Sequence, residues 1–293
     1  MSDRLAGRMA RELASPVLPA VRAVAEQLAG SGVVAVLFYG SILRTGDLGG
    51  VLDFYVLTDA RRPPKIWPRV GYREFAVAGQ TLRAKIATLP LATFAKAARG
   101  GSRDTTIWAR FVQPAALVWQ RDAATAASVA AAVADAVATA ARFAAALGPE
   151  SGEAVEFWRA LFRATYAAEF RVEAGGREDQ IVAHDPARYA ELLPLGWQRA
   201  GLWFDRAGEM LHPHLTGAER RAVLARWRSR RRWGKPLNVV RLLKAAFTFD
   251  GAARYAAWKI ERHTGVPVPL QPWQERHPIL AAPGVLWRVW RAK

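Results

Sequence analysis

The feature that most constrains the fold is a pair of strand-length apolar segments joined by a glycine-rich connection. Residues 33–39 form a continuous apolar run, which the dipeptide Gly40-Ser41 closes. A second apolar run follows at residues 51–57, after the turn-forming stretch of residues 45–50. Short apolar runs bounded by glycine and polar residues are typical of buried strands. The pattern therefore predicts two strands joined by a glycine-rich, turn-forming connection.

Further helices and strands alternate up to about residue 120. Apolar residues at helical spacing predict a helix over residues 5–13, and Ser15-Pro16 is typical of the start of a second helix. Two apolar segments separated by Gly79-Gln80-Thr81 predict a hairpin of residues 72–78 and 82–89. Other elements expected in this half are helices at residues 91–98 and 105–111 and a strand at residues 116–119. The alternation indicates an α/β (α+β) domain with a mixed sheet over residues 1–121.

Strand signals nearly vanish beyond Asp122. An alanine-rich helix is expected at residues 122–147, and residues 151–174 carry a broad apolar stripe typical of a second helix. Further helices are expected at residues 186–193, 216–233, 238–246 and 252–263. We therefore predict a helical second domain over residues 122–293 with a basic, Trp-rich C-terminal region.

The charge balance favours a polyanionic partner. The chain has 42 Lys and Arg residues against 25 Asp and Glu residues, which gives a net charge of +17. Such an excess is suited to nucleic acid, a nucleoside triphosphate or an anionic membrane. The 12 Trp residues favour the membrane interface, although Trp also stacks on bases and fills cores. No recognised RNA- or DNA-binding module is present, which disfavours nucleic acid.

Composition also excludes several kinds of site. The chain contains no Cys, which rules out disulfides, thiolate zinc sites and cysteine nucleophiles. The most apolar long segment, residues 122–148, is mostly alanine and carries Asp135 and Arg142, so we do not expect it to span a bilayer. The N-terminus lacks a signal-peptide pattern. We expect a cytoplasmic protein that binds peripherally to the inner face of the cell membrane.

The pair of apolar strands also carries the residues suited to phosphate chemistry. A strand that ends in Gly40-Ser41 presents backbone N–H groups and a hydroxyl, and glycine permits a close approach to a triphosphate. Asp53 on the next strand would project a carboxylate beside those phosphates, where it could hold Mg²⁺. The alternative is an ordinary strand–turn–strand with a solvated Asp.

This arrangement resembles the nucleotidyltransferase superfamily, in which two carboxylates usually alternate on the second strand. Here Tyr55 takes the second carboxylate position. The combination of Tyr39-Gly40-Ser41 with Leu52-Asp53-Phe54 more specifically resembles the mitochondrial-type phosphatidate cytidylyltransferases (the translocator assembly and maintenance family) and their bacterial relatives. The resemblance implies a nucleotidyltransferase-like head.

Three later segments resemble that family in the same order, so that the resemblance touches both halves of the chain. Residues 82–87 are similar to its Lys-containing strand, and residues 108–114 are similar to a Gly-Arg segment, with Ala109 where Gly is usual. Residues 240–248, followed by Tyr255 and Lys259, resemble its C-terminal Lys-Gly-x-x-Thr region, with Ala245 in place of Gly. A His- and Asn-rich segment of the family is absent after the Asp53 strand.

The resemblance implies transfer of CMP from CTP to phosphatidate, with Mg²⁺, to give CDP-diacylglycerol and pyrophosphate. Gly40 and Ser41 would then cradle the triphosphate and Asp53 would bind Mg²⁺. Lys85 would neutralise phosphate charge, while Arg110 and Lys244 would hold the triphosphate or the phosphatidate headgroup.

A second carboxylate and other readings stay open. Asp59, just past the strand, is the candidate for a second metal ligand, although an ordinary turn residue is the alternative. The chain could also be a nucleotidyltransferase with another acceptor, or a non-catalytic member of the fold that binds a nucleotide or a membrane.

Two basic, Trp-containing segments are candidates for membrane contact. One is a helix with seven arginines: Arg220, Arg221, Arg226, Arg228, Arg230, Arg231 and Arg232. The other is the tail of residues 285–291. Anionic headgroups attract such clusters. A solvated face, a composition bias or docking on the protein's own core are the alternatives.

Overall fold

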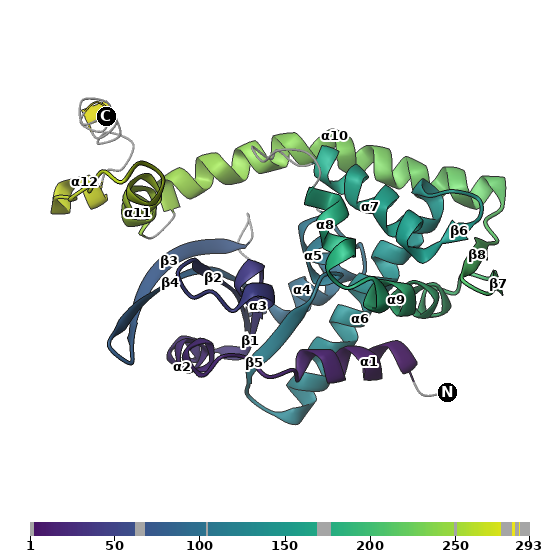
Figure 1. The fold of residues 1–293 in the computed structure, drawn as a ribbon, viewed down its shortest axis with the longest axis horizontal. Coiled ribbons are helices and arrows are strands. Elements are labelled where there is room, and N and C mark those ends of the chain that lie inside the picture. The colour runs from purple at the N-terminus through teal and green to yellow at the C-terminus, as the bar shows by residue number, and fades with distance from the viewer. Residues whose placement is uncertain are drawn as a thin grey trace.

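The fold combines a mixed sheet with a helical C-terminal half, which confirms the predicted fold class (Figure 1). The chain is 56% helical and 21% strand. The computed structural model describes residues 3–61, 68–103, 105–168, 177–248, 251–276, 283–284 and 287. Within these ranges, the description is limited to the backbone at residues 177–178, 235, 237–248, 252, 263 and 276.

Five strands form the main sheet, in the spatial order β3-β4-β2-β1-β5. Strands β2 and β4 pair in parallel and the other neighbours are antiparallel, so the sheet is mixed as expected. The strands are β1 (Val33–Tyr39), β2 (Val51–Thr58), β3 (Arg69–Val77), β4 (Gln80–Pro90) and β5 (Ala115–Gln120).

The hairpin between β3 and β4 is confirmed, but its turn lies one residue earlier than predicted. Ala78 and Gly79 are the two central residues, with φ values of 48° and 77°. Positive φ at both positions is the geometry of the two-residue turn that matches the twist of paired strands. Gln80 and Thr81, predicted as turn residues, therefore belong to β4.

The two faces of the main sheet carry separate apolar clusters. On one face Phe38, Phe54 and Ile86 pack with α2 (Pro19–Leu28). This helix begins at Pro19 rather than at Ser15-Pro16, because Pro19 occupies its first turn and supplies the preset φ of a helix start. The opposite face is covered by α1 (Arg4–Leu13), α4 (Leu91–Ala98), α5 (Thr106–Phe111) and α6 (Ala123–Leu147).

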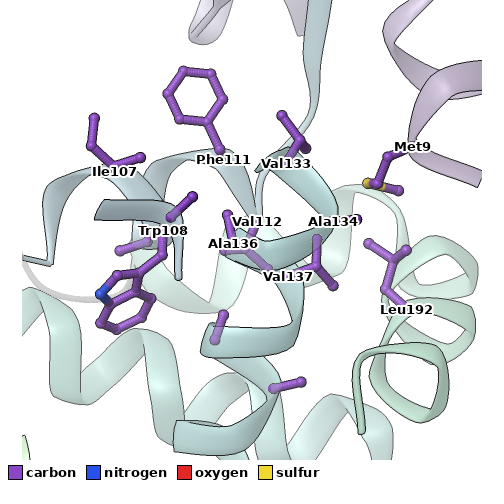
Figure 2. Close-up of a cluster of buried hydrophobic side chains, with 14 of the residues drawn as sticks. Met9, Ile107, Trp108, Phe111, Val112, Val133, Ala134, Ala136, Val137 and Leu192 are labelled. Atoms are coloured by element: carbon purple, nitrogen blue, oxygen red, sulfur yellow. The ribbon is translucent and has the colours of Figure 1, made fainter. Parts of the chain in front are cut away.

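Helix α6 is the centre of the helical layer. The Asp122 side chain accepts a hydrogen bond from the Thr125 N–H and caps this helix. Figure 2 shows Trp108 of α5 and Met9 of α1 around α6. The same cluster includes side chains from both sides of residue 121, so the two-domain division stays a prediction. Helix α6 is long and apolar enough to cross a membrane, and 56% of its most apolar 18-residue window is buried inside the protein.

The second half contains elements that the sequence pattern does not predict. One is a three-stranded sheet with the order β6-β8-β7. Its strand β6 lies where a helix is expected to start at residue 151, so the helix begins only at Ala154. The strands of this sheet have two to four residues, too short for a visible alternation. The elements are β6 (Gly152–Glu153), α7 (Ala154–Ala168), α8 (Arg177–His184), α9 (Pro186–Arg199), β7 (Phe204–Ala207) and β8 (Met210–Pro213).

A single helix, α10 (Gly217–Thr248), replaces the two helices expected at residues 216–233 and 238–246. Pro236, which lies between the two expected ranges, is inside this helix. Gly234 permits close packing, because a Cβ there would lie 2.7 Å from the Ala168 carbonyl oxygen of α7. Figure 1 shows α10 running from the helical half to α11 (Ala252–Thr264), beside the main sheet, before α12 (Pro272–Arg276).

Candidate functional site

A row of polar and aromatic residues crosses the main sheet at one height. Asp53 on β2 is opposite Tyr39 on β1 and Lys85 on β4, and Lys85 is opposite Tyr72 on β3. Residues directly opposite one another in a sheet point to the same face. The four side chains therefore share the face that carries α5 and α6.

The turn after β1 is pressed against the Asp53 carboxylate. Gly40 has φ 97° and ψ −164°, a conformation that is essentially restricted to glycine. A Cβ at this position would lie 2.7 Å from Asp53 Oδ2. Ser41 follows as the exposed first residue of α3 (Ser41–Thr45). The structure thus places the Gly40 turn directly against Asp53, with Ser41 next to Gly40 in the chain.

The Asp53 carboxylate is poorly hydrated and faces cations. Burial raises its pKa above the ordinary value, and the charges of Lys85 and Arg110 oppose that shift. Among the described side chains, none makes a hydrogen bond or an ion pair with this carboxylate. The cations are therefore near enough to act on Asp53 electrostatically without neutralising it by direct contact.

The pKa of Lys85 is also shifted, in the direction that favours the neutral form of its side chain. Its surface stays open to solvent, yet desolvation by the surrounding protein lowers its pKa. Asp53 opposes this shift, whereas the positive charges of Arg110 and Lys259 add to it. Lys85 and Arg110 therefore act on the Asp53 carboxylate, and Lys259 adds a third positive charge near Lys85.

Arg110 comes from α5 and is held over the sheet by an aromatic surface. Its guanidinium carbon lies 4.9 Å from the ring centre of Tyr39. Tyr55, which takes the second carboxylate position of the superfamily pattern, packs 5.4 Å from Tyr39 and 5.2 Å from Phe111 between ring centres. Tyr55 is 2% exposed, so a carboxylate in its place would be buried among aromatic rings.

Helix α11 supplies residues from the far end of the sequence. The Tyr255 ring lies 5.5 Å from the Tyr72 ring, and Asp53 contributes, after burial, to the raised pKa of Tyr255. Lys259 is one helical turn beyond Tyr255, so both lie on the same side of α11. Arg262 of α11 donates a hydrogen bond of 3.1 Å to the Gly49 carbonyl, next to the start of β2. The segment that ends in Tyr255 and Lys259 is therefore brought to the Asp53 row.

Two of the predicted site residues are not placed in this group. Asp59 lies six residues from Asp53, roughly 20 Å along an extended strand, and its carboxylate pairs with Arg121 at 2.9 Å. Asp59 therefore does not join Asp53 as a ligand of one ion. Lys244 lies in α10, in the stretch where side chains fall outside the description.

A divalent cation fits the site only with help from a ligand. Within the described part of the chain, no group of three or more His, Asp or Glu residues is placed to hold a metal ion. Mg²⁺ is often bound by one or two carboxylates together with substrate phosphates and water. Asp53 could therefore hold Mg²⁺ with a nucleotide's phosphates.

Comparisons with known proteins give no family for the chain: no protein-family model matches it, and no curated protein matches it. The assignment of the site therefore depends on its geometry and on the sequence resemblance.

Proposed function

We propose that the protein is a nucleotidyltransferase that transfers CMP from CTP to phosphatidate at a membrane surface. The observation that carries the proposal is the group around Asp53. Its half-buried carboxylate is pressed against the Gly40 turn, Lys85 and Arg110 act on it, and Lys259 acts on Lys85. The positive charges outnumber the carboxylate. Such a site favours a ligand with several negative charges, as a nucleoside triphosphate has.

The reaction needs positioning and charge neutralisation more than it needs a general base. The acceptor is a phosphate monoester, which is already ionised near neutral pH, since the second pKa of such groups is about 6. One of its oxygens attacks the α-phosphorus of CTP while the bond to pyrophosphate breaks. Catalysis of this kind depends on holding two anions together and stabilising the transferred charge.

Each residue of the group has a place in this scheme. The Gly40-Ser41 turn offers backbone N–H groups and a hydroxyl to the triphosphate, and Asp53 would hold Mg²⁺. When bound, Mg²⁺ would neutralise charge on the phosphate oxygens. Lys85 provides a compact charge beside Asp53, and the planar guanidinium of Arg110 suits a two-pronged phosphate contact.

The choice of CTP and phosphatidate is supported by the family resemblance. Its patches are spread from Tyr39 to Lys259 in the sequence. Five residues from these patches converge on one end of the sheet: Gly40, Asp53, Lys85, Arg110 and Lys259. A convergence of separated segments favours a shared site over coincidental similarity of each segment.

Contact with a membrane is part of the proposal, and the basic helix contributes less to it than its sequence suggests. Arg220 donates to the carbonyl oxygens of Ala146 and Gly148, and Arg230 is buried. Among the described side chains of α10, the arginines that remain exposed to an anionic surface are Arg221, Arg226, Arg228, Arg231 and Arg232. Trp287 is 55% exposed, while the rest of the tail at residues 285–291 lies outside the described residues.

A non-catalytic nucleotide binder is the second candidate. It is favoured by the aromatic packing of Tyr55, which leaves Asp53 without the second carboxylate usual on this strand. A nucleotidyltransferase with a different acceptor would keep the Asp53 group and lose only the lipid requirement.

The test is pyrophosphate release from the purified protein with each of the four nucleoside triphosphates, Mg²⁺, and vesicles with or without phosphatidate. We expect release with CTP only when phosphatidate is present, and its loss in Asp53→Asn. Asp59→Asn is the matched control, since it removes an exposed carboxylate far from the row. Pyrophosphate release without phosphatidate would show that the acceptor is a different molecule. No release from folded protein would favour the non-catalytic candidate.

A further inference from the structure

A second basic site lies in the helical half, in a pocket that shares no residue with the Asp53 group. The pocket has a volume of about 170 Å³ and lies between α6, α9, α10 and the end of α4. One water needs only about 10–15 Å³ of such volume, so a polyatomic ligand fits. The charged residues of its lining are five arginines and one acid: Arg99, Arg142, Arg199, Arg226, Arg230 and Asp135.

Asp135 neutralises only part of this charge. It pairs with Arg199 at 2.8 Å and lies 3.7 Å from Arg99. Arg142 and Arg226 make no side-chain hydrogen bond or ion pair with any described residue. Both are exposed at their ends and available to a ligand. Asp3, outside the lining, also pairs with Arg199. Five arginines against these two acids leave three positive charges in excess.

Arg230 gives the pocket a fixed, buried cation. The residue is 8% exposed and donates hydrogen bonds to the carbonyl oxygens of Gly100 (2.6 Å) and Ser102 (3.1 Å). Its guanidinium also lies 5.0 Å from the ring centre of Phe143, while its Nε is buried with no hydrogen-bond acceptor in the described part of the chain. Burial and the nearby charge of Arg226 lower the pKa of Arg230. An unneutralised cation buried in this way would gain from a bound anion.

We propose that this pocket binds a phosphate group, either free or on the headgroup of an anionic lipid. Arginine is suited to phosphate, because its planar fork of N–H donors matches two phosphate oxygens. Arg226 and Arg230 are one helical turn apart on α10, and Arg142 reaches the pocket from α6, so donors converge from two helices. The inference does not depend on nucleotidyl transfer at Asp53.

The test measures binding of inorganic phosphate and of pyrophosphate to the full chain by titration calorimetry, at constant ionic strength. The double variant Arg142→Gln/Arg226→Gln should weaken binding by about tenfold or more for each arginine, since charge-assisted contacts are lost. The matched control is Arg11→Gln/Arg22→Gln, which removes two exposed arginines of α1 and α2 and should bind as the wild type does. Asp53→Asn and Lys85→Gln separate this pocket from the nucleotide site, and both should retain the binding.

A second arm of the test uses vesicles of neutral phosphatidylcholine with and without phosphatidate. Binding of the free anions that only the pocket variant loses would identify a free phosphate as the ligand. Binding to phosphatidate vesicles that only the pocket variant loses, without binding of the free anions, would identify a lipid headgroup. Equal binding by the pocket variant and the control in both arms would overturn the proposal, as would free-anion binding that Asp53→Asn or Lys85→Gln abolishes while the pocket variant retains it.

Discussion

Substitution of Gly40 tests the contact between the turn and the Asp53 carboxylate. Alanine at this position meets two separate costs. The backbone conformation of Gly40 costs a residue with a side chain about 1–3 kcal/mol. The added Cβ would also lie 2.7 Å from Asp53 Oδ2, closer than a van der Waals contact allows, so the turn or the carboxylate must shift. Gly40→Ala should therefore lower both stability and activity.

The expected loss of stability is about 1–3 kcal/mol in the free energy of unfolding, measured from urea denaturation midpoints. The loss of pyrophosphate release should be larger than this stability loss implies. A shift of about 1 Å in a positioned group can reduce a rate about 100-fold. Activity is measured at a temperature where both proteins are fully folded, so that unfolding does not contribute.

The matched control is Gly79→Ala in the β3–β4 turn. Gly79 also has positive φ, 77°, but no atom of the described residues lies within 4 Å of a Cβ added there. It should lose stability through backbone strain alone and keep its activity. In an Asp53→Ala background, Gly40→Ala should cost less than in the wild type, because the carboxylate that it would meet is absent. Equal costs in both backgrounds, or full activity in Gly40→Ala, would refute the close-contact reasoning.

Three further predictions follow from charged groups. Burial raises the pKa of Asp53, so its charged form destabilises the native state. Asp53→Asn should therefore become more stable than the wild type as the pH rises through this raised pKa. The two proteins should have the same stability below the ordinary pKa of about 3.9, which urea denaturation at several pH values would show. Arg188→Met should lower the free energy of unfolding by about 3 kcal/mol, because this buried guanidinium binds Glu12 at 2.7 Å and the Val112 carbonyl at 3.0 Å. A loss no larger than that of Arg11→Met, which replaces an exposed arginine, would contradict this prediction. Binding to anionic vesicles should be salt-sensitive, and replacing four exposed arginines of α10 by Gln should weaken it by ~1 kcal/mol each. The four are Arg221, Arg228, Arg231 and Arg232. Equal co-sedimentation with neutral vesicles would argue against electrostatic binding to the membrane.

The sequence predicts local structure well where one physical signal dominates. The strand β1 has the predicted bounds, because a continuous apolar run ends at a glycine that the turn requires. Helix α6 is also confirmed, since Asp122 caps its start and Gly148 follows its end. The strands β6 to β8 are missed, because segments this short have no periodicity of their own and depend on pairing with one another.

The candidate site likewise contains residues that local sequence patterns predict and residues that they do not. Gly40, Ser41 and Asp53 can be paired from the sequence, since one short connection joins their strands. The approach of Lys259 to Lys85 cannot be derived from local patterns, because the two are far apart in the chain and α10 determines how they meet. The arginine pocket is similar: its lining comes from four helices, and the sequence showed only a basic segment.

The electrostatics of the Asp53 row indicate what kind of ligand would stabilise it. Without a ligand, Asp53 and Lys85 are each shifted toward their neutral forms, although they are neighbours of opposite charge. Desolvation is the largest cause for both, and Arg110 and Lys259 add repulsion at Lys85. A simple anion would relieve the repulsion among the cations but would oppose Asp53. A polyanion that arrives with a divalent cation satisfies both sets of charges, because the metal meets the carboxylate and the anion meets Lys85, Arg110 and Lys259. This mixed charge is the reason that we propose a metal–triphosphate complex as the ligand, and not either component alone.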